Sequence, residues 1–418
     1  MNSHKINKVK FSPKGVKIKM DWDVIIVGGG PSGCFTAKLI AELGFKVAIL
    51  EEHENVGQPV QCAGLISPRV MELVGITENI IINSLTDLRV FSPLGSKLCI
   101  SSSSNYACAI DRAAFDRCLA VKAEKAGANL LTGAKVYGLQ RIAEGYRVSV
   151  LLNNTEMTMD TRLIVGADGS FSKVAKWLAL KNTNPRAVMY AADVKLYCPD
   201  TSRIDIFLGR SLAPGWFGWV IPLDKNTCRV GSGYAIKRQN CSPQYYFKQM
   251  VNQYPQYFSG FKVLRYTGGS VPLGLMSKIY TQHAMLVGDA ACQNKPISGG
   301  GIYLGLRGAL LCAKVAIKAL LEGDLSEERL SLYQVFWEKE MKDEIVCGMK
   351  HRESFMDMTD EDMDFIIKFS RQPIVKNIIL KHGDIDYPSK LSHKLLSFKP
   401  WNKRFFKVAM KVAGYDKI

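Results

Sequence analysis

A glycine-rich turn between two short apolar segments constrains the fold of this chain more than any other feature. DVIIV (23–27) is an unbroken apolar run, typical of a buried parallel strand, and it leads into GGGPSG (28–33). A helical stretch, CFTAKLIAEL, stops at Gly44, and a second strand, KVAIL (46–50), is followed by Glu51. A strand, a glycine turn, a helix, a strand and an acid in this order predict a dinucleotide-binding unit of the Rossmann type.

Each residue type in this unit has a physical reason. Gly28 permits the tight turn, Gly30 lets the backbone approach a pyrophosphate, and Gly33 lets helix and strand pack closely. The helix N-terminus supplies oriented N–H groups for phosphate oxygens, and we expect Ser32 to bind the nucleotide as well. Glu51 lies 18 residues beyond Gly33, where its carboxylate can accept a hydrogen bond from a ribose hydroxyl.

Composition narrows the class of protein. A chain of 418 residues with 47% hydrophobic and 22% charged residues can bury the cores of two lobes. The eleven cysteines include no C-x-x-C pair, so we expect no disulfide framework, no metal site and a reducing cytosol. No uncharged apolar run approaches the about 20 residues of a membrane helix. The apolar segment 303–321 is interrupted by Arg307, Lys314 and Lys318, and it predicts a packed helix.

Three later segments distinguish between possible dinucleotides. Residues 108–128 place Arg112 at the head of an amphipathic helix. LIVGADGSFSKV (163–174) is a strand that ends in Asp168 and Gly169. Residues 285–305 form a strand that ends in Gly288-Asp289, followed by a glycine cluster that opens a long helix. With these elements in this order, the chain resembles the FAD-dependent oxidoreductases of the para-hydroxybenzoate hydroxylase type.

This resemblance implies FAD as cofactor and a set of contacts to it. Arg112 would contact the FAD, the Asp168–Gly169 turn would lie near the pyrophosphate, and Asp289 would bond the ribityl chain. Gly301 and Ile302 would offer backbone N–H groups to the flavin ring, where a helix N-terminus stabilises an anionic reduced flavin. The remaining residues expected at the cofactor are Cys62, Ala63, Gly64 and Val136.

A β-rich stretch lies between the strand that ends in Asp168-Gly169 and the strand that ends in Gly288-Asp289. Four segments alternate or run apolar as antiparallel strands do: 187–197, 203–209, 217–223 and 227–236. We therefore expect an α/β fold in which a Rossmann-like FAD-binding lobe is interleaved with an antiparallel β-sheet substrate lobe, followed by a helical region. The expected boundaries are a basic extension at 1–20, an FAD-binding domain at 21–180 and 265–325, a substrate sheet at 85–110 and 185–264, and a helical region at 326–418.

Two motifs carry a narrower resemblance. Phe217-x-Trp219-x-Ile221-Pro222 is similar to the aromatic-x-Trp-x-aromatic-Pro motif of geranylgeranyl reductases, which saturate the isoprenoid chains of archaeal lipids and of chlorophyll. Pro59-x-x-Cys62 is similar to their Pro-x-x-Cys motif. Ile221 stands where an aromatic residue is usual, and Leu65 where a glycine is often found. On aromatic content alone, this strand fits a hydrophobic sheet core equally well.

The resemblance implies a reductase of isolated C=C bonds in polyprenyl chains, above all those of archaeal ether lipids. Cys62 would face the flavin beside the alkene, with Ala63 and Gly64 leaving room for the isoalloxazine ring. Positive charge that builds on the more substituted carbon could be stabilised by Trp219 and Phe217. Whether Cys62 donates the proton or shapes the pocket stays open. The catalytic candidates are Cys62 and Trp219, and the substrate-binding candidates are Phe217, Trp219 and Pro222.

Other functions on the same fold remain as alternatives. One is an FAD-dependent monooxygenase or halogenase, but a halogenase needs a lysine to carry hypohalite, and none occurs between Lys46 and Lys97. Another is a non-catalytic, membrane-associated electron-transfer flavoprotein. The electron donor is open between NADPH, ferredoxin and a deazaflavin, because there is no second G-x-G-x-x-G and the arginine that usually follows the aspartate–glycine turn is Ala175 here.

Most of the net charge of +17 lies at the two ends of the chain. Residues 1–20 carry six lysines and no acid, which we interpret as a solvated tail. Residues 398–418 are amphipathic, with an apolar stripe and a separate stripe of Lys403, Lys407 and Lys411. This pattern fits a helix on an anionic bilayer or a helix packed on its own protein. Because a polyprenyl substrate must leave a bilayer, we expect a cytoplasmic protein, peripheral at the inner face of the cell membrane, with no nucleic-acid partner.

Overall fold

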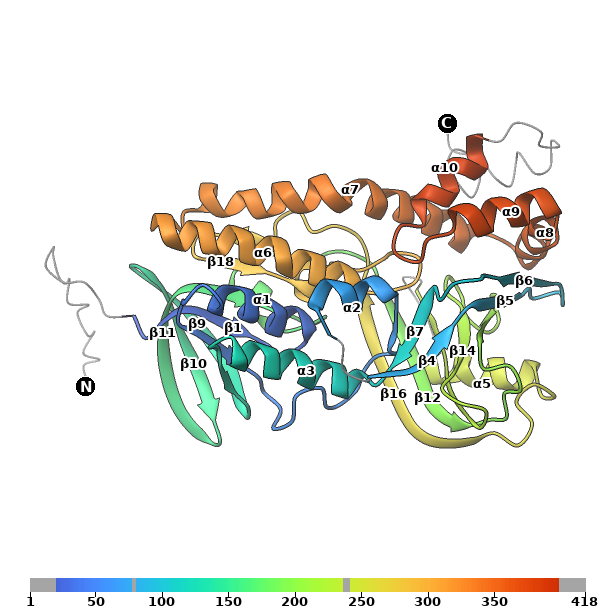
Figure 1. Ribbon diagram of the computed structural model, residues 1–418, viewed down its shortest axis with the longest axis horizontal. Coiled ribbons are helices and arrows are strands. Elements are labelled where there is room, and N and C mark those ends of the chain that lie inside the picture. Colours follow the sequence, from blue (N-terminus) through green and yellow to red (C-terminus); the bar gives the residue numbers. More distant parts are fainter. Residues whose placement is uncertain (1–19, 77–79, 236–240, 398–418) are drawn as a thin grey trace, which may run out of the picture.

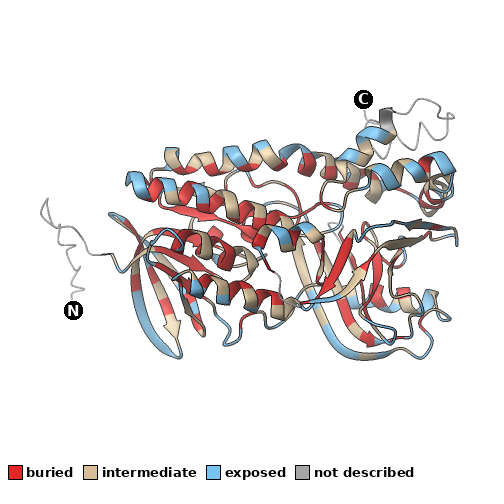
Figure 2. Cartoon of the chain, viewed as in Figure 1, coloured by how far each residue is buried: buried red, intermediate tan, exposed pale blue. Residues whose placement is uncertain are grey.

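The computed structural model describes residues 20–76, 80–235 and 241–397, which form two large β-sheets with a small one between them (Figure 1). Long helices pack along the first sheet and continue over the end of the second. Figure 2 shows buried residues running through the strands and along the inner faces of these helices. The α/β fold class expected from the sequence, with its helical C-terminal region, is confirmed.

The first sheet is the Rossmann-like part. Its strands lie in the order β17-β18-β11-β1-β2-β8, and β9 and β10 extend it beside β11. The neighbours from β18 to β8 are parallel, as the unbroken apolar runs predict, and β1 and β2 supply fully buried side chains. The strands are β1 (Trp22–Val27), β2 (Val47–Leu50), β8 (Asn129–Leu131), β9 (Ala134–Ile142), β10 (Gly145–Leu152), β11 (Thr155–Gly166), β17 (Tyr280–Thr281) and β18 (Ala284–Leu286).

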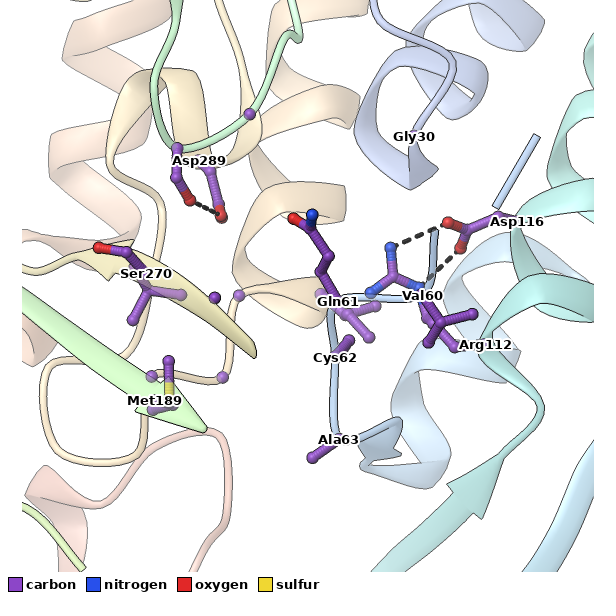
Figure 3. Close-up of a pocket in the computed structure, with 18 of the residues that line it drawn as sticks. Gly30, Val60, Gln61, Cys62, Ala63, Arg112, Asp116, Met189, Ser270 and Asp289 are labelled. Carbon is purple, nitrogen blue, oxygen red and sulfur yellow. Dashed lines mark hydrogen bonds and ion pairs between the residues drawn. The ribbon is translucent and has the colours of Figure 1, made fainter. Parts of the chain in front are cut away.

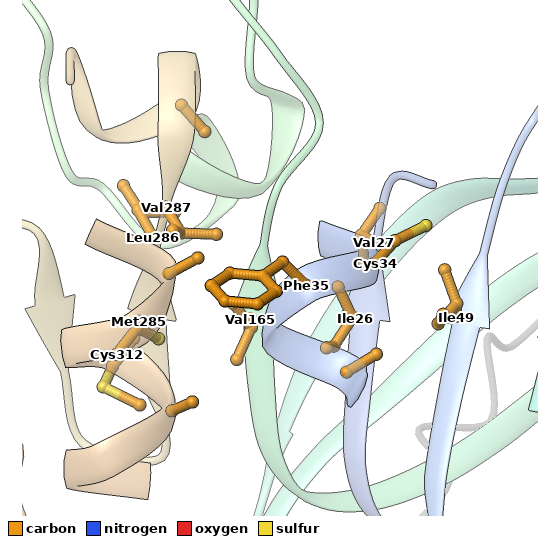
Figure 4. Close-up of a cluster of buried hydrophobic side chains, with 14 of the residues drawn as sticks. Ile26, Val27, Cys34, Phe35, Ile49, Val165, Met285, Leu286, Val287 and Cys312 are labelled. Carbon is orange, nitrogen blue, oxygen red and sulfur yellow. The ribbon is translucent and has the colours of Figure 1, made fainter. Parts of the chain in front are cut away.

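The helix after the glycine turn joins this sheet to the rest of the core. α1 (Pro31–Ala41) packs against both the parallel strands and the long helix α6 (Ile302–Glu322) (Figure 4). Phe35 projects from α1 between Val165 of the sheet and the residues near Cys312 of α6, and burying such a ring stabilises the fold by about 1.5–3 kcal/mol. The start of α1 can lie this close to the turn after β1 because residue 33 is a glycine. Any side chain at Gly33 would collide with the carbonyl oxygen of Gly28.

The second sheet is antiparallel apart from one pair. Its seven strands lie in the order β16-β12-β15-β14-β13-β5-β6, and only β13 and β5 are parallel. The four strands expected from the sequence are present, and the sheet also takes in β5, β6 and β16. The strands are β5 (Asp87–Phe91), β6 (Lys97–Ser101), β12 (Arg186–Lys195), β13 (Arg203–Phe207), β14 (Gly218–Pro222), β15 (Thr227–Tyr234) and β16 (Lys262–Pro272). The expected return to the FAD-binding lobe at residue 265 falls inside β16, so the chain re-enters the first lobe later than that boundary.

The remaining elements connect and cover the two sheets. A three-stranded sheet lies between them, in the order β3 (Leu65–Ile66), β7 (Ala107–Ile110), β4 (Ile81–Leu85). The short helices are α2 (Pro68–Val74), α3 (Arg112–Lys125), α4 (Lys173–Trp177), α5 (Pro243–Gln253) and the 3-10 turn η1 (Gly288–Ala291). The C-terminal region contains α7 (Glu327–Asp357), α8 (Asp360–Ser370), α9 (Pro373–His382) and α10 (Ser389–Ser397). None of the described helices combines the length and apolar content needed to cross a bilayer.

Candidate active site

A cavity of about 1070 Å³ lies where the carboxyl ends of the parallel strands meet the second sheet. The ends of β1 and β2 line it from one side, and β12, β13 and β14 line it from the other. In open parallel sheets, ligands bind beyond the carboxyl ends of the strands. Figure 3 shows side chains from both lobes pointing into this space.

At one end of the cavity, the glycine turn fixes the carboxylate of Glu51, which lines the cavity. The main-chain N–H of Gly29 donates to Glu51 Oε2 at 2.7 Å, and the other carboxylate oxygen lies 2.6 Å from His53 Nδ1. Gly28 has φ of +107°, and the oxygen of Ala167 occupies the place where its side chain would stand. At Gly30, no atom of the described residues lies within 4 Å of a Cβ position, so the N-terminus of α1 faces the cavity through bare backbone.

Beside this turn, α3 presents an arginine that is fixed by its own helix. Arg112 donates to both carboxylate oxygens of Asp116, at 2.7 and 3.0 Å (Figure 3). Burial alone would lower the pKa of Arg112, but Asp116 and the Cys62 thiol raise it above its ordinary value. Burial raises the pKa of Asp116, and Arg112 offsets part of that rise. The Arg112–Asp116 ion pair therefore holds the guanidinium in one position at the cavity wall, next to the loop that carries Cys62.

Two aspartates that follow strands of the first sheet line the cavity. Asp168 accepts hydrogen bonds from the main-chain N–H groups of Lys173 and Val174 at 2.7 and 3.0 Å, so its carboxylate caps α4. Asp289, in η1, accepts a hydrogen bond of 2.7 Å from Ser170 Oγ. Both aspartates line the cavity, but the carboxylate of Asp168 is occupied by the turn that it stabilises.

The start of α6 closes the next part of the wall. Gly299, Gly300 and Gly301 line the cavity, and a side chain at Gly301 would collide with Asn294 Oδ1. The side-chain nitrogen and oxygen of Asn294 are buried and have no hydrogen-bond partner among the described residues. Lys295 continues this wall and donates to Asp386 Oδ1 at 3.1 Å and to the carbonyl oxygen of Ile385 at 2.9 Å. A segment from the C-terminal region thus forms part of the cavity.

The second sheet contributes an apolar wall. Trp216 and Phe217 stack with ring centroids 5.1 Å apart, and Phe217 meets Trp219 edge to face at 6.0 Å. The Trp219 ring lies against Gly231 on the neighbouring strand, where any side chain would collide with it. The indole N–H of Trp219 has no hydrogen-bond partner among the described residues. Further apolar side chains in this wall are Val188, Met189, Ile204, Ile206 and Ile221.

The structure brings most of the predicted site residues together. Those that line the cavity are Gly28, Gly30, Glu51, Cys62, Ala63, Arg112, Val136, Asp168, Gly169, Phe217, Trp219, Asp289, Gly301 and Ile302. Ser32 packs its hydroxyl against Gly288 and Gly305, and Gly33 packs against Gly28. Gly64 has φ of +60° and faces Arg229, whereas Pro222 is buried in β14 opposite Cys228. These last four lie beside the cavity wall and are not part of its lining.

Some lining residues did not emerge from the sequence. Asp116 follows Arg112 by four residues, so an ion pair on one helix face was a readable signal for it. Lys295 and Asp386 are 91 residues apart, and Thr267 is 207 residues from the carbonyl that it binds. No local sequence pattern predicts such pairs, because only the tertiary fold brings their members together.

The cavity fits an FAD molecule. Gly30 and Gly169 both line it, and no atom of the described residues lies within 4 Å of a Cβ position at either, which leaves a backbone cradle at the nucleotide end. Asp289 and the glycines at the start of α6 line it as well, so a carboxylate and bare main chain are available further along the cavity. An acid at the end of the second strand completes the donor and acceptor set that a dinucleotide requires.

Comparison with known proteins agrees with this geometry. Residues 21–336 match the FAD binding domain family. An uncharacterized protein of Methanocaldococcus jannaschii is 33% identical over 90% of this chain and 95% of its own length. Digeranylgeranylglycerophospholipid reductase 1 of Methanothermobacter thermautotrophicus is 30% identical over 85% of this chain and 94% of its own length.

Solved structures share the fold. A geranylgeranyl bacteriochlorophyll reductase-like protein of Thermoplasma acidophilum has a TM-score of 0.83 at 22% identity, covering 93% of this chain and 99% of its own. CmlS, a flavin-dependent halogenase, has a TM-score of 0.67 at 15% identity, covering 89% of this chain and 76% of its own. The chain therefore belongs to the family of FAD-dependent oxidoreductases that contains the digeranylgeranylglycerophospholipid reductases.

Proposed function

We propose that this protein is an FAD-dependent reductase that saturates isolated C=C bonds of geranylgeranyl chains, above all those of archaeal-type ether lipids. One observation carries the proposal: a single cavity has a dinucleotide cradle at one side and a wall of aromatic and branched apolar side chains at the other. A polyprenyl chain has no polar group to recognise, so shape and apolar contact must hold it. The reductases among the relatives match most of the chain, which supports the same assignment.

The cofactor contacts follow from the cavity lining. The backbone at Gly30 and the N-terminus of α1 would hold the pyrophosphate, Glu51 the ribose, and Asp289 the ribityl chain. The main-chain N–H groups of Gly301 and Ile302, at the start of α6, would bind the ring. Bound and reduced FAD supplies the hydride for the reaction.

The apolar wall then orients the alkene and excludes water. Trp219 and Phe217 line the cavity, so a ring face turned toward the alkene would stabilise positive charge on the more substituted carbon. Cys62 stands on the opposite loop, and its Sγ accepts a hydrogen bond of 3.3 Å from the main-chain N–H of Gly64. Its thiol either delivers the proton or shapes the pocket around the alkene.

The test is direct reduction of a lipid by the FAD-loaded protein. Dithionite replaces the natural donor, so the result does not depend on whether that donor is NADPH, ferredoxin or a deazaflavin. Mass spectrometry of a digeranylgeranylglycerol phospholipid should show a gain of two hydrogens per saturated bond. Protein with oxidised flavin is the control. A flavin that is reduced and reoxidised without any change in the lipid would favour an electron-transfer module, and a halogenated product in the presence of halide and oxygen would favour a halogenase.

We further propose that the protein binds the surface of an anionic membrane through residues 398–418, which lie outside the described residues. The support is the lysine stripe of Lys403, Lys407 and Lys411 beside an apolar stripe in the sequence. Each lysine near an anionic surface contributes about 1 kcal/mol, so changing all three to glutamate should weaken binding to anionic vesicles by well over tenfold. Sedimentation with vesicles measures this, and equal sedimentation of both proteins at low salt would contradict it.

A further inference from the structure

The loop that carries Cys62 is held by the second sheet on both sides of the cysteine. Thr267 Oγ1, on β16, donates to the carbonyl oxygen of Val60 at 2.6 Å. Arg229 Nη1, on β15, donates to the carbonyl oxygen of Ala63 at 2.7 Å. Both bonds cross from the sheet to a loop of the other lobe, and Val60, Cys62, Ala63 and Thr267 all line the cavity. Figure 3 shows this loop with Val60, Cys62 and Ala63.

Arg229 is itself fixed in one position. Its side chain is only 5% exposed, and Nε donates to Asp193 Oδ1 at 2.8 Å. The second carboxylate oxygen of Asp193 accepts a hydrogen bond of 2.8 Å from Arg265. A charged group that is buried and paired in this way tolerates little movement, because any displacement leaves polar groups unsatisfied.

The same arginine explains the glycine after the cysteine. A Cβ on Gly64 would stand 2.6 Å from Arg229 Nη1 and 2.9 Å from the oxygen of Ile110. Gly64 also has φ of +60°, a conformation that favours glycine. Gly64 thus leaves room for the guanidinium of Arg229, which extends from β15 to the loop that carries Cys62.

Arg229 also shares a sheet face with Trp219. Trp219 pairs with Gly231, and Arg229, two residues earlier on the same strand, pairs with Ile221. Because alternate residues of a strand point to the same side, Arg229, Gly231, Trp219 and Ile221 occupy one face. Trp219 and Ile221 line the cavity, so the arginine ties the cysteine loop to the face that carries the aromatic wall.

We infer that Arg229 and Thr267 are positioning residues that fix the distance between the Cys62 thiol and Trp219 across the cavity. This inference rests on the proposed function in that Cys62 and Trp219 flank the reacting alkene. A loop without such bonds would open locally, and a displacement of about 1 Å at a reacting group can cost on the order of a hundredfold in rate. The two side chains thus set the geometry of the thiol through the loop that carries it.

The experiment measures the thiol directly, in FAD-loaded protein. Thr267→Val removes the hydroxyl with little change of shape, Thr267→Ser keeps it, and Arg229→Lys keeps the charge but loses the fork to Ala63 and Asp193. Iodoacetamide labelling followed by peptide mass spectrometry gives the alkylation rate of each cysteine. Loss of one hydrogen bond should raise the rate at Cys62 about fivefold in Thr267→Val and at least as much in Arg229→Lys. Thr267→Ser should match the wild type.

Buried cysteines serve as internal references. Cys34 and Cys312 lie in the core, so their alkylation reports unfolding of the whole protein. A faster reaction at Cys62 alone, with unchanged FAD content, supports the inference, and a lower kcat for lipid saturation at similar KM would extend it to turnover. An unchanged rate at Cys62, or equal acceleration at Cys34 and Cys312, would overturn it. Should Arg229→Lys fail to fold, Thr267→Val and its serine control decide. Because labelling needs no substrate, a failure of the proposed function leaves this test intact.

Discussion

Removing Asp386 should release the C-terminal segment from the cavity. The Asp386 side chain is 0% exposed and accepts hydrogen bonds from Lys295 Nζ at 3.1 Å and Arg69 Nη1 at 3.2 Å. The same lysine donates to the carbonyl oxygen of Ile385 at 2.9 Å. In Asp386→Ala, the buried ammonium of Lys295 keeps only that neutral partner among the residues that the structure describes.

The size of the effect follows from the burial of both charges. Removing one partner of a buried ion pair typically costs about 3–5 kcal/mol, because the other charge stays desolvated. Replacing both partners by apolar residues is often neutral, so Lys295→Met combined with Asp386→Leu should recover most of the loss. The exposed pair Lys342–Glu338 is the matched control, since water screens side chains that are 54% and 30% exposed and leaves their ion pair a small contribution to stability.

Hydrogen exchange measures this locally. The amides of Asp386 and Tyr387 donate to Asp384 Oδ1 at 2.9 and 3.2 Å, so they report opening of the segment. Asp386→Ala should speed their exchange by roughly a hundredfold, which corresponds to about 3 kcal/mol, while Glu338→Ala leaves it nearly unchanged. If the two variants behave alike, or if the double variant exchanges as fast as Asp386→Ala, the reasoning from burial is refuted.

Three further outcomes are expected. Glu51→Ala and Asp289→Ala should each raise the Kd for FAD by roughly tenfold or more in a fluorescence titration, because each removes a charge-assisted hydrogen bond; an unchanged Kd would place the residue away from the cofactor. Trp219→Ala should lower lipid saturation per bound flavin, because the ring lies in the apolar wall; equal loss of product and flavin would make it a core residue. Burial alone would raise the pKa of Asp364, but hydrogen bonds, first that from Lys368, lower it from 3.8 to about 2. Its stabilisation is therefore complete above about pH 4 and is lost as the pH falls through about 2, a loss that acid titration should show reduced in Asp364→Asn.

The sequence predicts those parts of the site that depend on short stretches of chain. The glycine turn is an example, since the collision at Gly28 and the packing at Gly33 involve neighbours within the same βαβ unit or on the next parallel strand. The strand assignments succeed for the same reason, because apolar runs and alternation report burial directly. Phe217 and Trp219 come to line the cavity because a strand presents alternate residues to one face.

Residues whose role depends on distant partners could not be found in this way. Gly64 fits a loop that makes room for a flavin, but its immediate neighbour is the guanidinium of Arg229, 165 positions later in the numbering. Asp168 reads as a cofactor ligand by its place after a strand, yet its carboxylate also caps α4. In each case the sequence gives the residue type and the location, and the tertiary contact decides what the side chain binds.

The C-terminal region belongs to the site although no motif marks it. The family match ends at residue 336, whereas Ile385 and Asp386 line the cavity. Their segment is attached to three separate elements: Arg69 of α2 binds Asp384, Lys295 binds Asp386, and the Tyr303 and Tyr387 hydroxyls lie 3.1 Å apart. These anchors lie on both sides of the glycine cluster at the start of α6. A segment so late in the sequence thus lines the same cavity as the second-sheet strand that carries Trp219, and only the tertiary fold brings the two together.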